Sequence, residues 1–150
     1  QTCALPISHS RGFVGPPSIY CELMLFYASK KTPASAVDLF LTMQMAGVEA
    51  DVHTCRALME ALEAGAQSDM ALELLDSMEK NDVPIDIETY NLALRALAAN
   101  GEWQQAIHVL KGICSAGLEP GSETLHIVAE ACITGDQPAI AKRILSHVKN

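Results

Sequence analysis

One alanine column recurs through the chain at a constant interval of 35 residues. Its members are Ala36, Ala71, Ala106 and Ala141. A fixed period of this length is typical of a repeat array, in which each repeat is one packing unit stacked on the next. A large apolar residue follows each alanine four residues later, as one face of a helix requires, at Phe40, Leu75, Leu110 and Leu145. We therefore predict that the alanines lie at tight joints between helices, where a larger residue would overpack the contact.

Turn-forming residues divide each repeat into two helices. We expect the first helices at about 18–29, 53–64, 88–99 and 122–134. We expect Thr32, Ser68 and Asp136 to cap second helices, and Gly47 to end one in a left-handed conformation. The prediction is an all-α fold, an α-solenoid of helix-turn-helix repeats wound into a right-handed superhelix. Its repeats should run at about 17–51, 52–86, 87–121 and 122–150.

Residues 1–15 fall outside this pattern. They show no helical period, and Ser, Gly and Pro interrupt them. About the first seven residues also resemble the translation of a common sequencing adapter, so they are left out of the fold prediction. We expect a disordered tail over 1–15, partly artefactual, followed by the solenoid over 16–150.

Charge and motif content exclude several classes of function. The net charge of −8, from ten Lys and Arg against eighteen Asp and Glu, argues by itself against a nucleic-acid partner. No apolar run is long enough to span a bilayer, so no membrane partner is expected. The five cysteines have no C-x-x-C spacing, and neither a disulfide framework nor a metal site is expected. No catalytic motif appears, so we expect no enzymatic activity, no cofactor and no small-molecule substrate.

Two strings in the third repeat carry a resemblance to a known family. Glu88-Thr89-Tyr90-Asn91 opens its first helix, and Ala116-Gly117-Leu118-Glu119-Pro120 closes its second. Together with the period of 35, these strings closely resemble the pentatricopeptide repeat (PPR) family, and the resemblance covers Pro17 to Asn150. It implies single-stranded RNA binding in mitochondria or plastids, with one repeat reading one base through two or three side chains.

The resemblance implies RNA contacts at three positions in each repeat. A polar residue early in the first helix would meet the base edge, at Cys21, Arg56, Asn91 and His126. The residue closing the repeat would help to fix the base, at Asp51, Asp86 and Gly121. The residue three before the early polar one would pack against base faces, at Ser18, His53, Glu88 and Glu123. Asn91 is the best candidate base contact, because its amide both donates and accepts.

Departures from the family pattern leave a second function open. No packing position is Val, two are Glu, and further acids follow on the same face at Glu60, Glu63 and Glu130. The same face carries two basic residues, Arg56 and Arg95, and the acidic residues could neutralise their charge across adjacent repeats. One hypothesis is an RNA-binding protein acting in organellar RNA processing, stability, editing or translation. The alternative is a scaffold whose acidic concave face holds a basic protein partner.

Overall fold

The computed structural model describes residues 15–148, and every regular element in that range is a helix. The helices are α2 (Pro17–Ser29), α3 (Pro33–Met45), α4 (Val52–Ala64), α5 (Ser68–Lys80), α6 (Ile87–Ala99), α7 (Trp103–Ser115), α8 (Ser122–Thr134) and α9 (Pro138–Leu145). The prediction of an all-α solenoid is confirmed. The tail expected at 1–15 lies outside the described residues, apart from Gly15.

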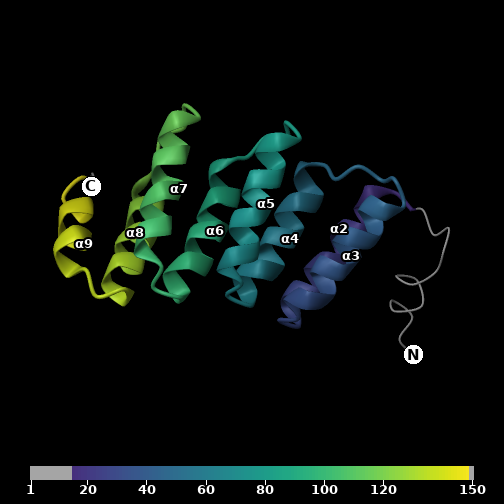
Figure 1. Cartoon of the computed structure of the whole chain (residues 1–150), viewed down its shortest axis with the longest axis horizontal. Coiled ribbons are helices and arrows are strands. Elements are labelled where there is room, and N and C mark those ends of the chain that lie inside the picture. The colour runs from purple at the N-terminus through teal and green to yellow at the C-terminus, as the bar shows by residue number, and fades with distance from the viewer. Residues whose placement is uncertain (1–14, 149–150) are drawn as a thin grey trace.

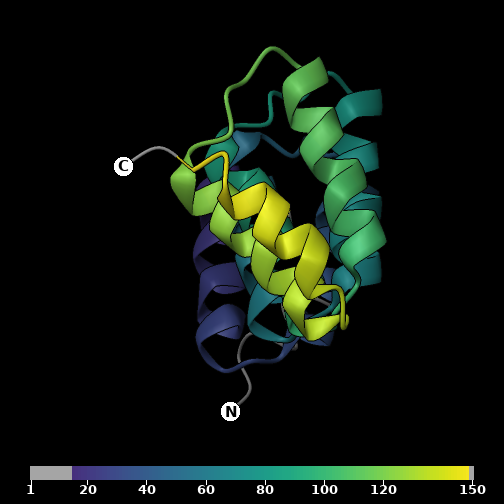
Figure 2. The same ribbon diagram turned by 90° about the vertical axis from the view of Figure 1, so that its left-hand side faces the viewer.

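The helices fall into two alternating series with the same period. We call α2, α4, α6 and α8 the A helices, and α3, α5, α7 and α9 the B helices. Each series begins anew every 35 residues, at Pro17, Val52, Ile87 and Ser122 for A and at Pro33, Ser68, Trp103 and Pro138 for B. Every A helix packs against the B helix of its own repeat and against the neighbouring A helices. The helix pairs stand side by side in Figure 1, and Figure 2 shows them from the end of the array.

Left-handed residues reverse the chain at the same two points of each repeat. A positive φ occurs in the A-to-B turns at Lys31, Ala66, Gly101 and Asp136, and in the B-to-A turns at Gly47, Asp82 and Gly117. This conformation is energetically unfavourable for residues with a Cβ, and it is less unfavourable for Asp than for most of them. Gly47, predicted as a left-handed terminator, has a φ of 81° and fits that role.

Two of the three predicted helix caps were wrong. Ser68 is the first residue of α5, and Gln67 precedes it, while Asp136 is the left-handed turn residue before Gln137. Thr32 does stand at the N-cap of α3, but its hydroxyl makes no capping bond and donates to the carbonyl of Tyr27 at 3.2 Å. The three side chains were predicted as caps because Ser, Thr and Asp favour helix starts. Here the tight A-to-B turn decides their conformation instead.

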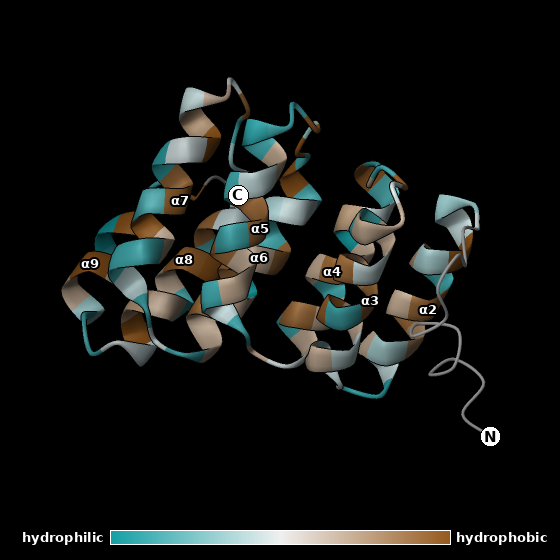
Figure 3. Cartoon of the chain, turned by 45° about the vertical axis from the view of Figure 1, so that its right-hand side comes forward, coloured by the Kyte–Doolittle hydropathy of each residue, from teal (hydrophilic) through white to brown (hydrophobic). Residues whose placement is uncertain are grey.

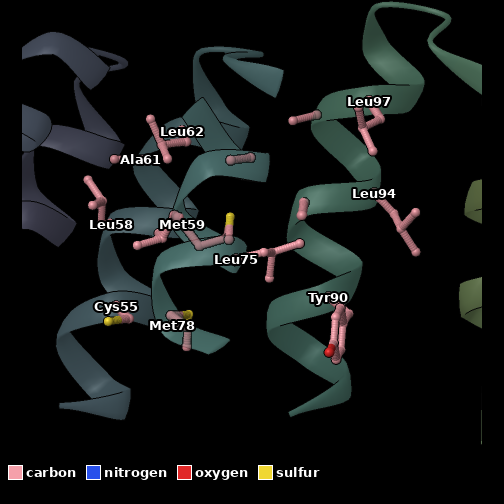
Figure 4. Close-up of a cluster of buried hydrophobic side chains, with 14 of the residues drawn as sticks. Cys55, Leu58, Met59, Ala61, Leu62, Leu75, Met78, Tyr90, Leu94 and Leu97 are labelled. Carbon is pink, nitrogen blue, oxygen red and sulfur yellow. The ribbon is translucent and has the colours of Figure 1, made fainter. Parts of the chain in front are cut away.

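The core lies between the A and B helices. One cluster of buried hydrophobic residues runs from Tyr20 to Ala131, and a second, small cluster of Ala129, Cys132 and Ala141 lies in the fourth repeat. Ala36, Ala71 and Ala106 are fully buried and Ala141 is 2% exposed, as the alanine period predicted. Figure 4 shows part of this core, with Met59 of α4 near Leu75 of α5 and Leu58 on the opposite side of α4. In Figure 3 hydrophobic and hydrophilic residues mix along α5 and α7, whose apolar sides face this core.

Candidate nucleic-acid interface

The residues that close the first two repeats are also the N-caps of the next A helices. The Asp51 carboxylate accepts hydrogen bonds from the Thr54 amide and hydroxyl, both at 2.8 Å. Asp86 accepts the same two bonds from Thr89 at 2.9 and 2.7 Å. Partial burial raises the pKa of each carboxyl, but the hydrogen bonds outweigh it, so both pKa values are lower than usual. Both carboxylates are exposed and ionised on the A-helix side.

The fold brings the early and closing residues of one repeat near each other. Burial raises the pKa of the Cys21 thiol, and the charge of Asp51 raises it further. Likewise, the positive charge of Arg56 adds to the lowering of the pKa of Asp86. The pairing of positions that the resemblance implies is therefore spatially possible in the first and second repeats.

Two ion pairs join successive repeats across the A helices. Arg56 Nη2 lies 2.5 Å from Glu88 Oε1. Arg95 pairs in the same way with Glu123 of the following repeat. All four side chains are between 39% and 62% exposed, so these pairs add little to the stability of the fold. They do cancel the charge of both arginines on this face, as the sequence allowed.

A small pocket lies between these two ion pairs. It has a volume of about 150 Å³ and is lined by Arg56, Glu60, Glu88, Asn91, Leu92, Arg95 and Glu123. The Nε atom of Arg56 is buried and has no hydrogen-bond partner among the described residues. The pocket therefore combines hydrogen-bonding groups of both kinds within one volume. We call it the A-face pocket.

Asn91 sits at this pocket and is held by the next repeat. Asn91 is only 7% exposed, and its Oδ1 accepts a hydrogen bond from the Thr124 hydroxyl at 2.7 Å. The predicted base contact is thus more buried than its counterparts, since Arg56 is half-buried and His126 is exposed.

Other predicted residues lie outside the pocket. His53 is exposed, and its charge helps to lower the pKa of Asp51. The ring Nδ1 of His126 lies 2.7 Å from the Ser122 carbonyl oxygen of its own helix. Gly121 precedes α8 without a side chain to cap it, and Ser18 is exposed on α2. Cys21 donates weakly to the carbonyl of His53 at 3.5 Å.

Thr124 is the residue of this site that the sequence reasoning missed. It belongs to a column of buried threonines with the same period, Thr54, Thr89 and Thr124. The column could have been found by aligning the repeats in the way that revealed the alanines. Thr124 has a different hydrogen-bond partner from Thr54 and Thr89, because Gly121 provides no carboxylate three residues earlier.

Residues 15–148 contain neither a cluster of metal ligands nor a membrane-spanning helix. No three His, Cys, Asp or Glu side chains in this range converge as a metal site would require. Within the same range, no helix has both the length and the apolar composition needed to cross a membrane.

The fold and this pocket together define a solenoid of helix pairs with a polar interface along its A helices. A family model described as "Pentatricopeptide repeat-containing protein" matches residues 16–113, and the chain belongs to this family. A search of curated proteins gave no match.

Solved structures agree with the fold. The crystal structure of the pentatricopeptide repeat protein PPR10 from maize superposes with a TM-score of 0.79 at 20% identity, over 91% of this chain and 20% of that one. A structure of PPR10 in complex with an 18-nt psaJ RNA element superposes with a TM-score of 0.75 at 19% identity, over 96% and 21% of the two chains. This chain therefore spans about a fifth of the solved relatives' length.

Proposed function

We propose that this solenoid binds single-stranded RNA along its A helices. The observation that carries the proposal is the A-face pocket, where Arg56 and Asn91 occupy the same position of adjacent repeats. A spacing of one such side chain per repeat suits a strand that offers one base per repeat. Membership of the PPR family and the fold shared with PPR10, which has been solved with RNA, support it.

Charge limits the affinity that the chain can reach. Glu60, Glu88 and Glu123 line the pocket against two arginines, and the whole chain carries a net charge of −8. Few phosphates can be neutralised by such a face, so binding should depend only weakly on salt. Hydrogen bonds to base edges and stacking must supply most of the free energy of binding.

A titration of fluorescently labelled single-stranded RNA tests the proposal. Replacing Asn91 by Ala should weaken binding about fivefold, the effect of one lost hydrogen bond. The matched control is Asn81→Ala, which removes an exposed amide at the end of α5. Equal affinities of both variants and the unaltered chain would contradict RNA binding at the A-face pocket. Thermal melts should accompany the titration, because Asn91→Ala also leaves the buried Thr124 hydroxyl without its partner.

The second candidate is a protein-binding scaffold, which the excess of carboxylates around the pocket favours. A basic peptide would gain from Glu60, Glu88 and Glu123, whereas RNA would be repelled by them. An oligolysine peptide and an RNA of similar length distinguish the two. Tight, salt-sensitive binding of the peptide, together with no binding of RNA, would replace the first proposal with this one.

The cellular setting is proposed from the family alone. We place the protein in a mitochondrion or plastid, acting in RNA processing, stability, editing or translation. The described repeats would cover only a few nucleotides at one base per repeat. Imaging of the tagged protein with organelle markers tests the location, and a cytosolic signal would contradict it.

A further inference from the structure

Helix α2 carries apolar residues on its exposed side as well as on its buried side. Tyr20 and Met24 are fully buried, whereas Ile19 and Phe26 are 40% and 51% exposed. A helix that is apolar all round is normally covered all round. Within residues 15–148, α3 and α4 pack against α2 and leave its other side open, because α2 lies at one end of the row of helices (Figure 1).

The register of the repeats fixes the direction in which this open side points. Ile19 occupies the position of Thr124, whose hydroxyl reaches the preceding A helix through its bond to Asn91. Phe26 occupies the position of Ala131, two turns further along the same side of α8. Ile19 and Phe26 therefore lie on the side of α2 that, in the later repeats, faces the preceding A helix.

The side chains on this side do not suit another repeat stacked in the same way. At the position of Phe26 the later repeats have a fully buried alanine: Ala61, Ala96 and Ala131. The position of Lys30 corresponds to Gly65, where an added Cβ would lie 2.5 Å from Pro33 Cγ of the preceding repeat. Phenylalanine and lysine at these two positions would overpack a joint built like the others. A partner that covers this side must therefore pack against it in a different way.

Opposite charges stand on either side of Phe26 along this surface. Glu22 lies one turn before Phe26, and Lys30, the C-cap of α2, lies one turn after it. Lys30 Nζ is 5.5 Å from the centre of the Phe26 ring, so the charged and apolar parts are continuous. No ion pair in the described part of the chain includes Glu22 or Lys30. We call Ile19, Glu22, Phe26 and Lys30 the α2 end face.

We propose that two copies of this chain associate through their α2 end faces, with the two helices antiparallel and a two-fold axis beside Phe26. Glu22 of one copy then lies opposite Lys30 of the other, and the same contact occurs a second time by symmetry. Both residues are four positions from Phe26, about 6 Å along the helix axis, so their spacings match. The charge pattern is thus complementary to itself, while the two Phe26 rings supply the apolar centre that such an interface needs.

Sedimentation velocity of the 150-residue chain over a series of concentrations tests the proposal, and it should show a monomer–dimer equilibrium. Phe26→Ala should weaken the dimer about a hundredfold, because each copy loses the aromatic ring at the centre of the interface. Leu41→Ala is the matched control, since Leu41 is 50% exposed but lies on α3. Its dimer should be as tight as that of the unaltered chain. Circular dichroism should show that both variants keep their helices.

Charge exchange tests the antiparallel arrangement. Glu22→Lys and Lys30→Glu should each weaken the dimer about tenfold, because both Glu22–Lys30 contacts become repulsive. The double variant Glu22→Lys/Lys30→Glu should recover the original affinity, since its contacts are attractive again and its net charge is unaltered. If only the overall charge mattered, the two single variants would shift the affinity in opposite directions, which would overturn the antiparallel arrangement. Failure of the double variant to recover would overturn it too.

Two results would overturn the association itself. One is equal weakening by Phe26→Ala and Leu41→Ala, which would place the interface elsewhere. The other is a chain that stays monomeric at every concentration. In that case, NMR contacts between the Phe26 ring and residues 1–14 would assign the α2 end face to that segment of the same chain.

Discussion

Glu88 holds Arg56 across the boundary between the second and third repeats, with 2.5 Å between Oε1 and Nη2. Glu88 occupies a position where the family resemblance implied an apolar residue against a base, and Arg56 occupies an early polar position. Two side chains that were predicted to contact RNA, Glu88 and Arg56, therefore neutralise each other's charge. The electrostatic cost of this pair to RNA binding can be measured.

Glu88→Gln should strengthen RNA binding by up to about fivefold, because it removes a charge near the strand and releases Arg56. Stability should change by less than about 1 kcal/mol, since the pair is largely exposed. Glu79→Gln is the matched control, with the same change in net charge at an exposed position of α5. Titrations at low salt check the difference between the variants. Equal gains from both would show that only the overall charge matters.

A second prediction concerns the stacking of the A-to-B turns. A Cβ placed on Gly135 would lie 2.5 Å from the Gly101 carbonyl oxygen and 2.5 Å from Trp103 Cδ1. Gly135→Ala should therefore push the fourth repeat away from the third and cost about 1–3 kcal/mol. The cost is steric, since the φ of −87° at Gly135 is open to any residue.

Gly121→Ala serves as the control for that substitution. A Cβ at Gly121 would contact nothing within 4 Å, and its φ is −82°. Alanine caps a helix less well than glycine, so in urea denaturation followed by circular dichroism this variant should lose a little stability, and Gly135→Ala should lose more. A midpoint for Gly135→Ala equal to that of the control would disprove close packing between these turns.

The repeat architecture was predictable from the sequence because its causes are local and recur. One small residue at each joint and a 3.6-residue apolar spacing produce the same helix pair four times, and the alanines are buried as expected. The helix caps were less predictable. Whether Ser68 or Gln67 precedes α5 depends on a left-handed Ala66, which no propensity favours.

The site was predictable only in its positions. Aligned repeats place Arg56 and Asn91 on the A helices. Arginines and glutamates on the same face of adjacent repeats indicate the two ion pairs that the structure contains. The hydrogen bond of Thr124 was not predictable, because position 121 offers no carboxylate and the hydroxyl bonds instead to an acceptor 33 residues earlier in the sequence, Asn91 Oδ1. Such a choice requires the distance between α6 and α8, which only the folded chain provides.

Acid stability provides a third prediction. The pKa values of Asp51 and Asp86 are lowered in the fold, so these caps stabilise it fully above the unfolded-state pKa of about 3.9. Their contribution is lost as the pH falls from about 4 through the lower folded-state values. Asparagine caps a helix about as well as aspartate but does not titrate. The double variant Asp51→Asn/Asp86→Asn should match the unaltered chain near pH 7 and lose less stability in acid. Parallel curves of unfolding midpoint against pH would contradict this.

The alanine joints provide the last prediction. Ala106 is fully buried at the start of α7, where the B helix of the third repeat meets the core. Ala106→Leu adds three carbons to a site without space, so side chains or helices must shift at a cost of about 1–3 kcal/mol. Ala34→Leu is the control, because the same change occurs in α3 at an exposed alanine. In thermal melts, only Ala106→Leu should show a lower unfolding midpoint.

Because each repeat contacts only its neighbours, Ala106→Leu should reduce protection from hydrogen exchange mainly in the third repeat and in the repeats beside it. Uniform loss of protection along the whole array would instead show that the solenoid unfolds as one unit.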